Sequence, residues 1–180
     1  MMEKCRSGKK CPGELRIRRA LNKDIDRILD LLVQVNNVHH EGRPDLFLAD
    51  RTKYSREDLE VLLHDESNPV FVAVDEKDRV LGYGFCQFQS HAEDNNWPDI
   101  VTLYIDDICV DHSCRGMHVC RTIYDYIVNY ARKAGCYNLT LNVWEKNPGA
   151  RAFYESCGME VQKTGMEMVL KSFEKEIVIC

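Results

Sequence analysis

The chain has 180 residues, of which 44% are hydrophobic and 29% charged, and its formal net charge is −5. This composition is ordinary for a globular protein of one domain, and the negative charge argues against nucleic acid as a partner. No apolar run approaches the ~20 residues of a membrane-spanning helix, so no membrane partner is expected.

The chain begins with charged residues that no apolar stretch follows, which predicts a flexible lead over residues 1–13 rather than a secretory signal. A single domain is expected over residues 14–180. The nine cysteines are odd in number and lack C-x-x-C spacing, which is typical of free thiols in a reducing cytoplasm. No metal site is expected, although Cys5 and Cys11 could form a local zinc site or bridge.

In the first half of the chain, hydrophobic periodicity predicts a strand, two helices and a β-hairpin. The strand is residues 15–18, the first helix contains Ile25, Ile28, Leu29 and Leu32, the second begins at the capping box 55–58, and the hairpin pairs 70–74 with 80–85. The helical pattern breaks at residues 39–45, which are expected to form a loop.

The second half predicts a strand over 100–110, a helix over 115–134, a strand over 139–143, a helix over 147–157 and a final strand over 166–170. The strand–helix–strand order from residue 100 to residue 143 makes a crossover between parallel strands. The fold class is therefore α/β (α+β), a mixed sheet with helices on its faces.

The stretch from Asp107 to Cys120 runs from an apolar strand, through a polar turn, into a helix that opens with Arg115-Gly116. The first turn of a helix has unpaired N–H groups and the positive end of the peptide dipole, so it can hold a phosphate. Gly116 would let the backbone come close to that phosphate. The alternative is an exposed arginine beside an ordinary flexible turn.

A second stretch, from Asn147 to Gly158, places an amide and a phenol on one helix. Asn147 and Tyr154 are seven residues apart and share a helix face. Asn147-Pro148 also has the form of an N-cap followed by the first helical residue, which is the structural alternative.

The two stretches resemble motifs A and B of the GCN5-related N-acetyltransferase (GNAT) superfamily, whose motif A reads [Q/R]-x-x-G-x-[G/A]. Arg115 and Gly116 fit, but His118 and Cys120 stand at the two later glycine positions. The resemblance, to small single-domain members of bacterial type, implies a mixed and mostly antiparallel sheet of six to seven strands. It also implies a parallel splayed pair and helices on both faces.

The resemblance implies acetyl transfer from acetyl-CoA to a primary amine. The pantetheine arm would pair with Ile108, Cys109 and Val110, and Asn147 would contact that arm or position a neighbouring residue. The diphosphate would lie over Arg115, Gly116, Met117, His118, Val119, Cys120 and Arg121. The Val110 N–H would donate to the oxyanion, and Tyr154, which also lies beside the cofactor, would act as general acid toward the leaving thiolate.

Asp106 and Asp107 interrupt an apolar strand, where carboxylates are costly without partners or a purpose. Tyr104-Ile105-Asp106-Asp107 resembles the Tyr-Leu-Glu-Asp of spermidine/spermine acetyltransferases, in which the Glu position, here Asp106, is the base or amine anchor. Strict alternation places Asp106 on the face of Ile108 and Val110, and a bulge would reverse that parity. Asp106 is therefore expected to relay the amine proton through a bridging water, because Asp is shorter than Glu, and Asp107 is a further catalytic candidate. A salt-bridged strand end is the alternative for both carboxylates.

The acceptor site is expected to include His39, His40 and Glu41, in a loop that lines the acceptor pocket of this family, together with Asp106 and Asn142. Glu93, Asp94 and Asp99 form an acidic loop that could attract a cation. We expect a small cationic amine as acceptor and a homodimer as the assembly. A protein or peptide amino group is the alternative acceptor, and a non-catalytic acyl-CoA-binding module is the alternative function.

Overall fold

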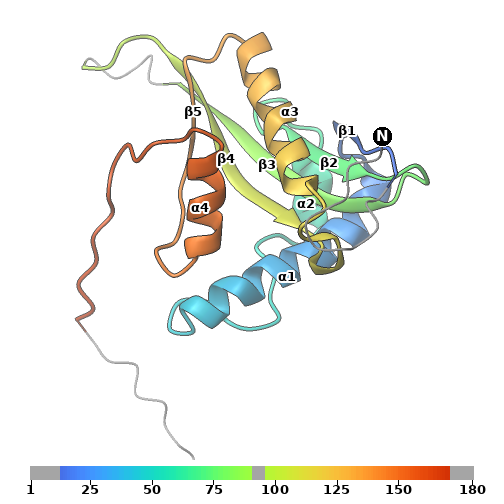
Figure 1. Ribbon diagram of the computed structural model, residues 1–180, viewed down its shortest axis with the longest axis horizontal. Coiled ribbons are helices and arrows are strands. Elements are labelled where there is room, and N and C mark those ends of the chain that lie inside the picture. The colour runs from blue at the N-terminus through green and yellow to red at the C-terminus, as the bar shows by residue number, and fades with distance from the viewer. Residues whose placement is uncertain (1–12, 91–95, 171–180) are drawn as a thin grey trace, which may run out of the picture.

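The computed structural model describes residues 13–90 and 96–170, so most of the expected N-terminal lead, with Cys5 and Cys11, lies outside it, as do Glu93 and Asp94. Figure 1 shows a central sheet with helices on both faces. The elements are β1 (Arg16–Arg19), η1 (Asn22–Asp24), α1 (Ile25–Gly42), α2 (Arg56–Leu62), β2 (Val70–Val74), β3 (Val80–Ser90), β4 (Val101–Val110), η2 (His112–Cys114), α3 (Val119–Lys133), β5 (Asn138–Leu141) and α4 (Pro148–Ser156).

The sheet has five strands in the order β1-β2-β3-β4-β5. The pairs β1–β2, β2–β3 and β3–β4 are antiparallel, whereas β4 and β5 are parallel, with Ile105 opposite Leu141 as their last paired residues. The predicted mixed sheet with a parallel pair is therefore confirmed.

The predicted number of six to seven strands is wrong for the described residues, because the expected final strand 166–170 does not form. Residues 159–170 have no regular structure and run away from α4 (Figure 1). The side chain of Met166 is 96% exposed and that of Leu170 is 85% exposed. A strand is stabilised by ladder pairing and by burial of one face, and this segment has neither. Glu167 instead pairs with Arg43, at 2.8 Å.

Two hydrophobic clusters hold helices against the sheet. One cluster joins α1 and α2 to one face through residues such as Ile28, Leu32 and Leu59, and the other joins α3 and α4 to the opposite face. On β3, Gly84 allows α3 to pack closely, because a Cβ atom there would lie 2.8 Å from the Ile127 side chain. The two clusters place α1 and α3 on opposite sides of β4.

Two predicted helix boundaries are wrong. Helix α1 continues through residues 39–42 and ends only before Pro44, whose ring disfavours helical backbone at Arg43. Helix α3 begins at Val119 rather than at Arg115. Gly116 and His118 have φ values of 80° and 61°, which a right-handed helix does not accommodate.

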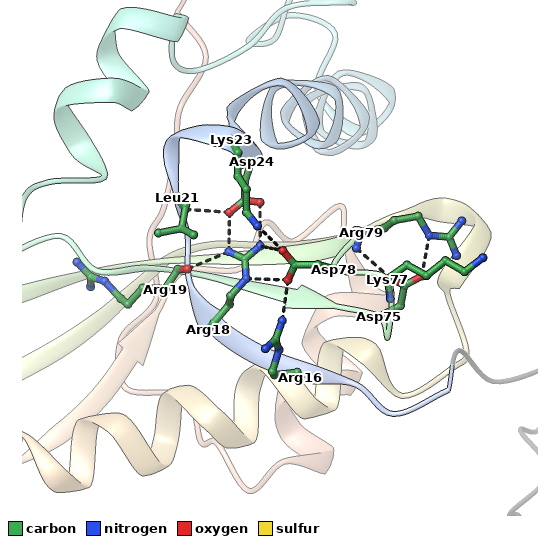
Figure 2. Close-up of polar contacts among 10 residues, drawn as sticks. All are labelled: Arg16, Arg18, Arg19, Leu21, Lys23, Asp24, Asp75, Lys77, Asp78 and Arg79. Atoms are coloured by element: carbon green, nitrogen blue, oxygen red, sulfur yellow. Dashed lines mark hydrogen bonds and ion pairs between the residues drawn. The ribbon is translucent and has the colours of Figure 1, made fainter.

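A charged cluster ties β1 to the β2–β3 turn (Figure 2). The guanidinium of Arg18 donates to Asp24 at 2.7 Å and to Asp78 at 3.1 Å, and Asp78 also pairs with Arg16 and Lys23. Every carboxylate in this cluster has a cation, so the cluster has the character of a structural clamp.

Three further findings concern the described part of the chain. Its six cysteines, Cys86, Cys109, Cys114, Cys120, Cys136 and Cys157, are free thiols. It contains no group of three or more His, Cys, Asp or Glu side chains that could hold a metal ion. Within the same ranges, none of the helices combines the length and apolar character needed to cross a membrane.

Candidate active site

The site lies where β4 and β5 part. Their pairing stops at Ile105 and Leu141, whereas β4 continues to Val110 along β3. Beyond Ile105, the edge of β4 that faces β5 therefore has no β5 partner. An extended chain such as a pantetheine arm can pair with a strand edge of this kind. The predicted residues Ile108, Cys109 and Val110 form this end of β4.

A β-bulge at Asp106 turns two carboxylates toward the same side of the sheet. Cys86 lies opposite Ile105 and Phe85 opposite Asp107, which leaves Asp106 as the extra residue on β4. Ile105 and Ile108 both pack in the α3 cluster, although they are three residues apart. Strict alternation, which placed Asp106 on the face of Ile108, is therefore wrong. Asp106 and Asp107 instead contact residues on the α1 and α2 side.

Asp107 shares a short hydrogen bond with a buried phenol. The Tyr83 hydroxyl donates to Asp107 Oδ2 at 2.6 Å, and the Tyr83 side chain is fully buried beneath α1. Burial raises the pKa of Asp107 to about 6, against the opposing effect of this hydrogen bond. Asp107 is therefore a carboxylate at neutral pH that can accept a proton more readily than an exposed aspartate.

Asp106 is paired with a lysine from a distant loop. Lys53, from the loop between α1 and α2, donates to the two carboxylate oxygens of Asp106 at 2.8 and 2.6 Å. The Tyr54 hydroxyl lies 3.4 Å from the same carboxylate. A pocket of about 230 Å³ opens here, lined among others by Lys53, Tyr54, Phe85 and Asp106.

The turn between β4 and α3 has the features of an anion site. Gly116 and His118 both adopt left-handed backbone, after which the amides of Val119, Cys120 and Arg121 form the first turn of α3. Such a turn presents N–H groups and a positive dipole to an anion. The residues present thus fit a diphosphate.

The side chains around that turn differ in their exposure, charge and partners. The guanidinium of Arg121 is held by Asp125 at 2.9 Å, on the exposed side of α3. Arg115 is exposed, whereas Met117 and Cys120 are partly buried against the α3 cluster. Burial raises the pKa of the Cys120 thiol to about 12, so it is a neutral thiol at physiological pH. Its small neutral side chain is compatible with an approaching anion.

Tyr154 lies on α4, on the α3 side of the sheet. Its ring is partly buried and packs against Tyr124 and Phe153, with centroids 6.1 and 5.1 Å away. Burial raises the pKa of Tyr154 well above its ordinary value, and the negative charge of Asp107 acts in the same direction. The phenol is therefore protonated at neutral pH and can serve as a proton donor.

The two predicted asparagines have structural contacts. The Asn147 side chain accepts from the Ala150 amide at 3.1 Å and caps α4, which confirms the N-cap interpretation. Asn142 follows β5 and donates to the Tyr104 hydroxyl at 3.1 Å, bridging the gap between β5 and β4. Asn142 thus lies at the edge of the site.

His39, His40 and Glu41 lie in the last turn of α1 and not in a loop as expected. The His39 ring stacks on Phe47 at 5.1 Å, and burial lowers the pKa of His39. His40 Nδ1 lies 2.6 Å from the Phe47 carbonyl oxygen, and Glu41 is exposed. No hydrogen bond or ion pair joins these three described residues to Asp106 or Asp107, so the structure does not link the predicted acceptor residues into one polar network.

Lys53, Tyr54 and Tyr83 carry no motif in the sequence that marks them as site residues. Tyr83 lies inside an apolar strand, and its partner Asp107 is 24 residues away on the next strand. Local periodicity therefore cannot predict their hydrogen bond. Lys53 lies in a loop without periodicity. The carboxylate pair in β4 was the one available signal, because buried charges require partners.

Comparison with known proteins agrees with the fold and the motifs. The family model described as the acetyltransferase (GNAT) family matches residues 32–159. Glucosamine 6-phosphate N-acetyltransferase of Arabidopsis thaliana is 30% identical over 56 residues, which are 31% of this chain and 36% of that protein. The match thus spans little more than a third of the curated relative.

Solved structures match over most of the chain. A point mutant of the BH1408 protein from Bacillus halodurans has a TM-score of 0.82 and 29% identity, covering 87% of this chain and 99% of that one. The aminoglycoside acetyltransferase meta-AAC0020 from an uncultured soil metagenomic sample, in complex with sisomicin, has a TM-score of 0.66 and 18% identity. This match covers 87% of this chain and 97% of that one, and it shows likeness of fold.

Proposed function

Since this chain belongs to the acetyltransferase (GNAT) family, we propose that it transfers an acetyl group from acetyl-CoA to a primary amine of a small cationic molecule. Transfer would occur by direct attack in a ternary complex. The observation that carries the proposal is the bulge that turns Asp106 and Asp107 to one side of the sheet, at the point where β4 leaves β5.

The acceptor amine would meet the carboxylates first. An alkyl amine has a pKa near 10.4 and arrives as an ammonium ion, so it must be held and must lose a proton before it attacks. Asp106 is accessible from the pocket and would anchor the ammonium. Asp107, whose pKa of about 6 lies closer to neutrality, would take the proton directly or through a water.

Acetyl-CoA supplies the activated acetyl group, and the residues described above would hold it. Ile108, Cys109 and Val110 would pair with the pantetheine arm, and the Val110 N–H would donate to the oxyanion. The backbone of residues 115–121 would hold the diphosphate. Left-handed Gly116 and the first-turn amides of α3 support this assignment.

Tyr154 would donate a proton to the leaving sulfur. It packs in the α3 cluster, whereas the partners of Asp106 and Asp107 belong to the α1 side. A proton acceptor and a proton donor would thus approach the gap between β4 and β5 from opposite faces. This arrangement suits removal of a proton from the amine on one side and its delivery to sulfur on the other.

The acceptor class is supported by charge and by the names of similar proteins. The Asp106 carboxylate, which lines the pocket, and the adjacent carboxylate of Asp107 favour a cation. A glucosamine 6-phosphate acetyltransferase and an aminoglycoside acetyltransferase are among the proteins similar to this chain. We further propose a cytoplasmic location, which suits the free thiols, and a homodimer.

An acetylation screen tests the proposal. Radiolabelled acetyl-CoA is incubated with the protein and with polyamines, aminoglycosides, amino sugars, amino acids and N-terminal peptides. Turnover of a small cationic amine is expected, and Asp106→Asn should lower kcat/KM for it and change its pH profile. Binding of acetyl-CoA without turnover of any amine would instead favour an acyl-CoA-binding module.

A further inference from the structure

The loop between α1 and α2 places a primary ammonium group on the carboxylate of Asp106. Lys53 Nζ lies 2.8 and 2.6 Å from the two carboxylate oxygens and 5.2 Å from the centroid of the Tyr54 ring. Tyr54 is in turn stacked on Phe85, with centroids 5.6 Å apart. A carboxylate beside an aromatic face is a recognition site for an ammonium ion.

A second lysine shows what is particular about this pair. Lys23 pairs with Asp78, and the side-chain exposures there, 57% and 30%, resemble the 53% and 25% of Lys53 and Asp106. Asp78, however, also binds Arg16 and Arg18 in the clamp of Figure 2. Asp106 has Lys53 as its cation among the described residues, lies beside a pocket, and directly precedes Asp107 in the bulge.

We propose that Lys53 occupies the ammonium subsite of the acceptor and is itself acetylated by the same chain. This inference rests on the proposed function, because it takes Asp106 as the anchor of the acceptor amine. It adds that Lys53 fills the subsite in the free protein. An external amine can then enter only by displacing Lys53 or after Lys53 has been acetylated.

The step balances as an ordinary acyl transfer. The Lys53 ammonium gives up one proton, through Asp107 or water, and its lone pair forms a bond to the acetyl carbon. The carbon–sulfur bond of acetyl-CoA then breaks, the nitrogen loses a second proton, and the sulfur leaves as coenzyme A after gaining one. The products are Nε-acetyl-lysine, coenzyme A and one net proton.

Acetylation would change the site electrostatically. The amide that forms carries no charge, so the ion pair with Asp106 is lost and the carboxylate becomes available to an external ammonium. Lys53→Ala should have the same effect and lower KM for a cationic acceptor at least threefold, with little change in kcat. Lys53→Arg keeps the charge and should not lower KM.

The labelling reaction should accelerate with pH. Burial disfavours the charged form of Lys53, but the hydrogen bond and charge of Asp106 outweigh it and raise the pKa of Lys53. The neutral amine is therefore scarcer near pH 7 than for a free lysine, and its population increases as pH rises.

The test is incubation of the full chain with acetyl-CoA, followed by intact mass and peptide mapping. We expect one acetyl group on Lys53, at least tenfold faster than on Lys23, with a rate constant independent of protein concentration. Asp106→Asn should slow labelling of Lys53 at least tenfold. Equal labelling of the two lysines, a rate constant that increases with protein concentration, or faster labelling in Asp106→Asn would overturn the proposal.

A binding measurement needs no acetyl-CoA. Calorimetric titration with n-butylammonium should give tighter binding to Lys53→Ala than to the wild type, and the gain should vanish in Lys53→Ala/Asp106→Asn. Equal affinities for wild type and Lys53→Ala would contradict the proposed subsite. If external amines are acetylated while Lys53 stays unlabelled, this inference fails and the proposed function stands. If neither Lys53 nor any external amine is acetylated, both this inference and the proposed function fail.

Discussion

The Tyr83 hydroxyl donates a 2.6 Å hydrogen bond across the β3–β4 pair to Asp107, the residue that directly follows the bulged Asp106. The phenol is fully buried and the carboxylate partly so. This bond favours the ionised form of Asp107, while burial disfavours it. Tyr83 is therefore a positioning residue that tunes the proposed proton acceptor without touching the acceptor pocket.

Tyr83→Phe removes that hydrogen bond and should raise the pKa of Asp107. With the wild type, kcat/KM should fall as pH decreases through about 6, where Asp107 becomes protonated. In the variant, the midpoint should move upward by roughly one pH unit. Tyr126→Phe, on the outer part of α3, is the control and should leave the midpoint unchanged. An identical pH profile for Tyr83→Phe would exclude the tuning role.

Asp107→Asn should stabilise the fold, relative to the wild type, by more at neutral pH than at acid pH. The pKa of Asp107 is raised from 3.8 to about 6 on folding, so its favourable contribution is complete below pH 3.8 and is lost as pH rises through 6. The difference between variant and wild type in unfolding free energy should therefore increase between pH 3.5 and 7.5, by at most about 3 kcal/mol. Urea unfolding at the two pH values measures this difference, and an equal difference at both pH values would contradict a raised pKa of Asp107.

Tyr154→Phe should lower kcat by about 100-fold, the scale of general acid catalysis, while the Kd of acetyl-CoA changes little. The ring stays in place, because its packing against Tyr124 and Phe153 does not need the hydroxyl. Tyr124→Phe, which removes the adjacent phenol, is the matched control. Equal losses in kcat and in acetyl-CoA affinity would make Tyr154 a structural residue.

Gly116→Ala should weaken acetyl-CoA binding and cost about 1 kcal/mol of stability, since its φ of 80° is unfavourable for a residue with a Cβ atom. Gly135→Ala is a matched control at the other end of α3, with a φ of 75° and open space around the position. It should cost similar stability but leave the Kd of acetyl-CoA unchanged. Equal effects of both variants on that Kd would remove residues 115–121 from the proposed diphosphate site.

Periodicity and motif spacing were sufficient for most of the elements and for the family, because both depend on residues close together in the chain. The apolar positions of α1 and α3, the capping box at Ser55 and the N-cap at Asn147 were all apparent before the structure. Predicted helix boundaries were wrong where the backbone conformation decides them, as at His118, whose left-handed backbone precedes the start of α3. The final strand failed because pairing, and not composition, makes a strand.

The sequence by itself determined that a strand with two aspartates precedes a turn, a helix whose first turn could hold a phosphate, and a helix with a phenol. Only the tertiary structure decided which way those aspartates face, because a one-residue bulge reverses side-chain parity and depends on pairing with β3. It alone also brought Tyr83 to Asp107 and Lys53 to Asp106, contacts between residues 24 and 53 positions apart. Such contacts arise from the packing of strands and loops in space, which local patterns of apolar and polar residues do not encode.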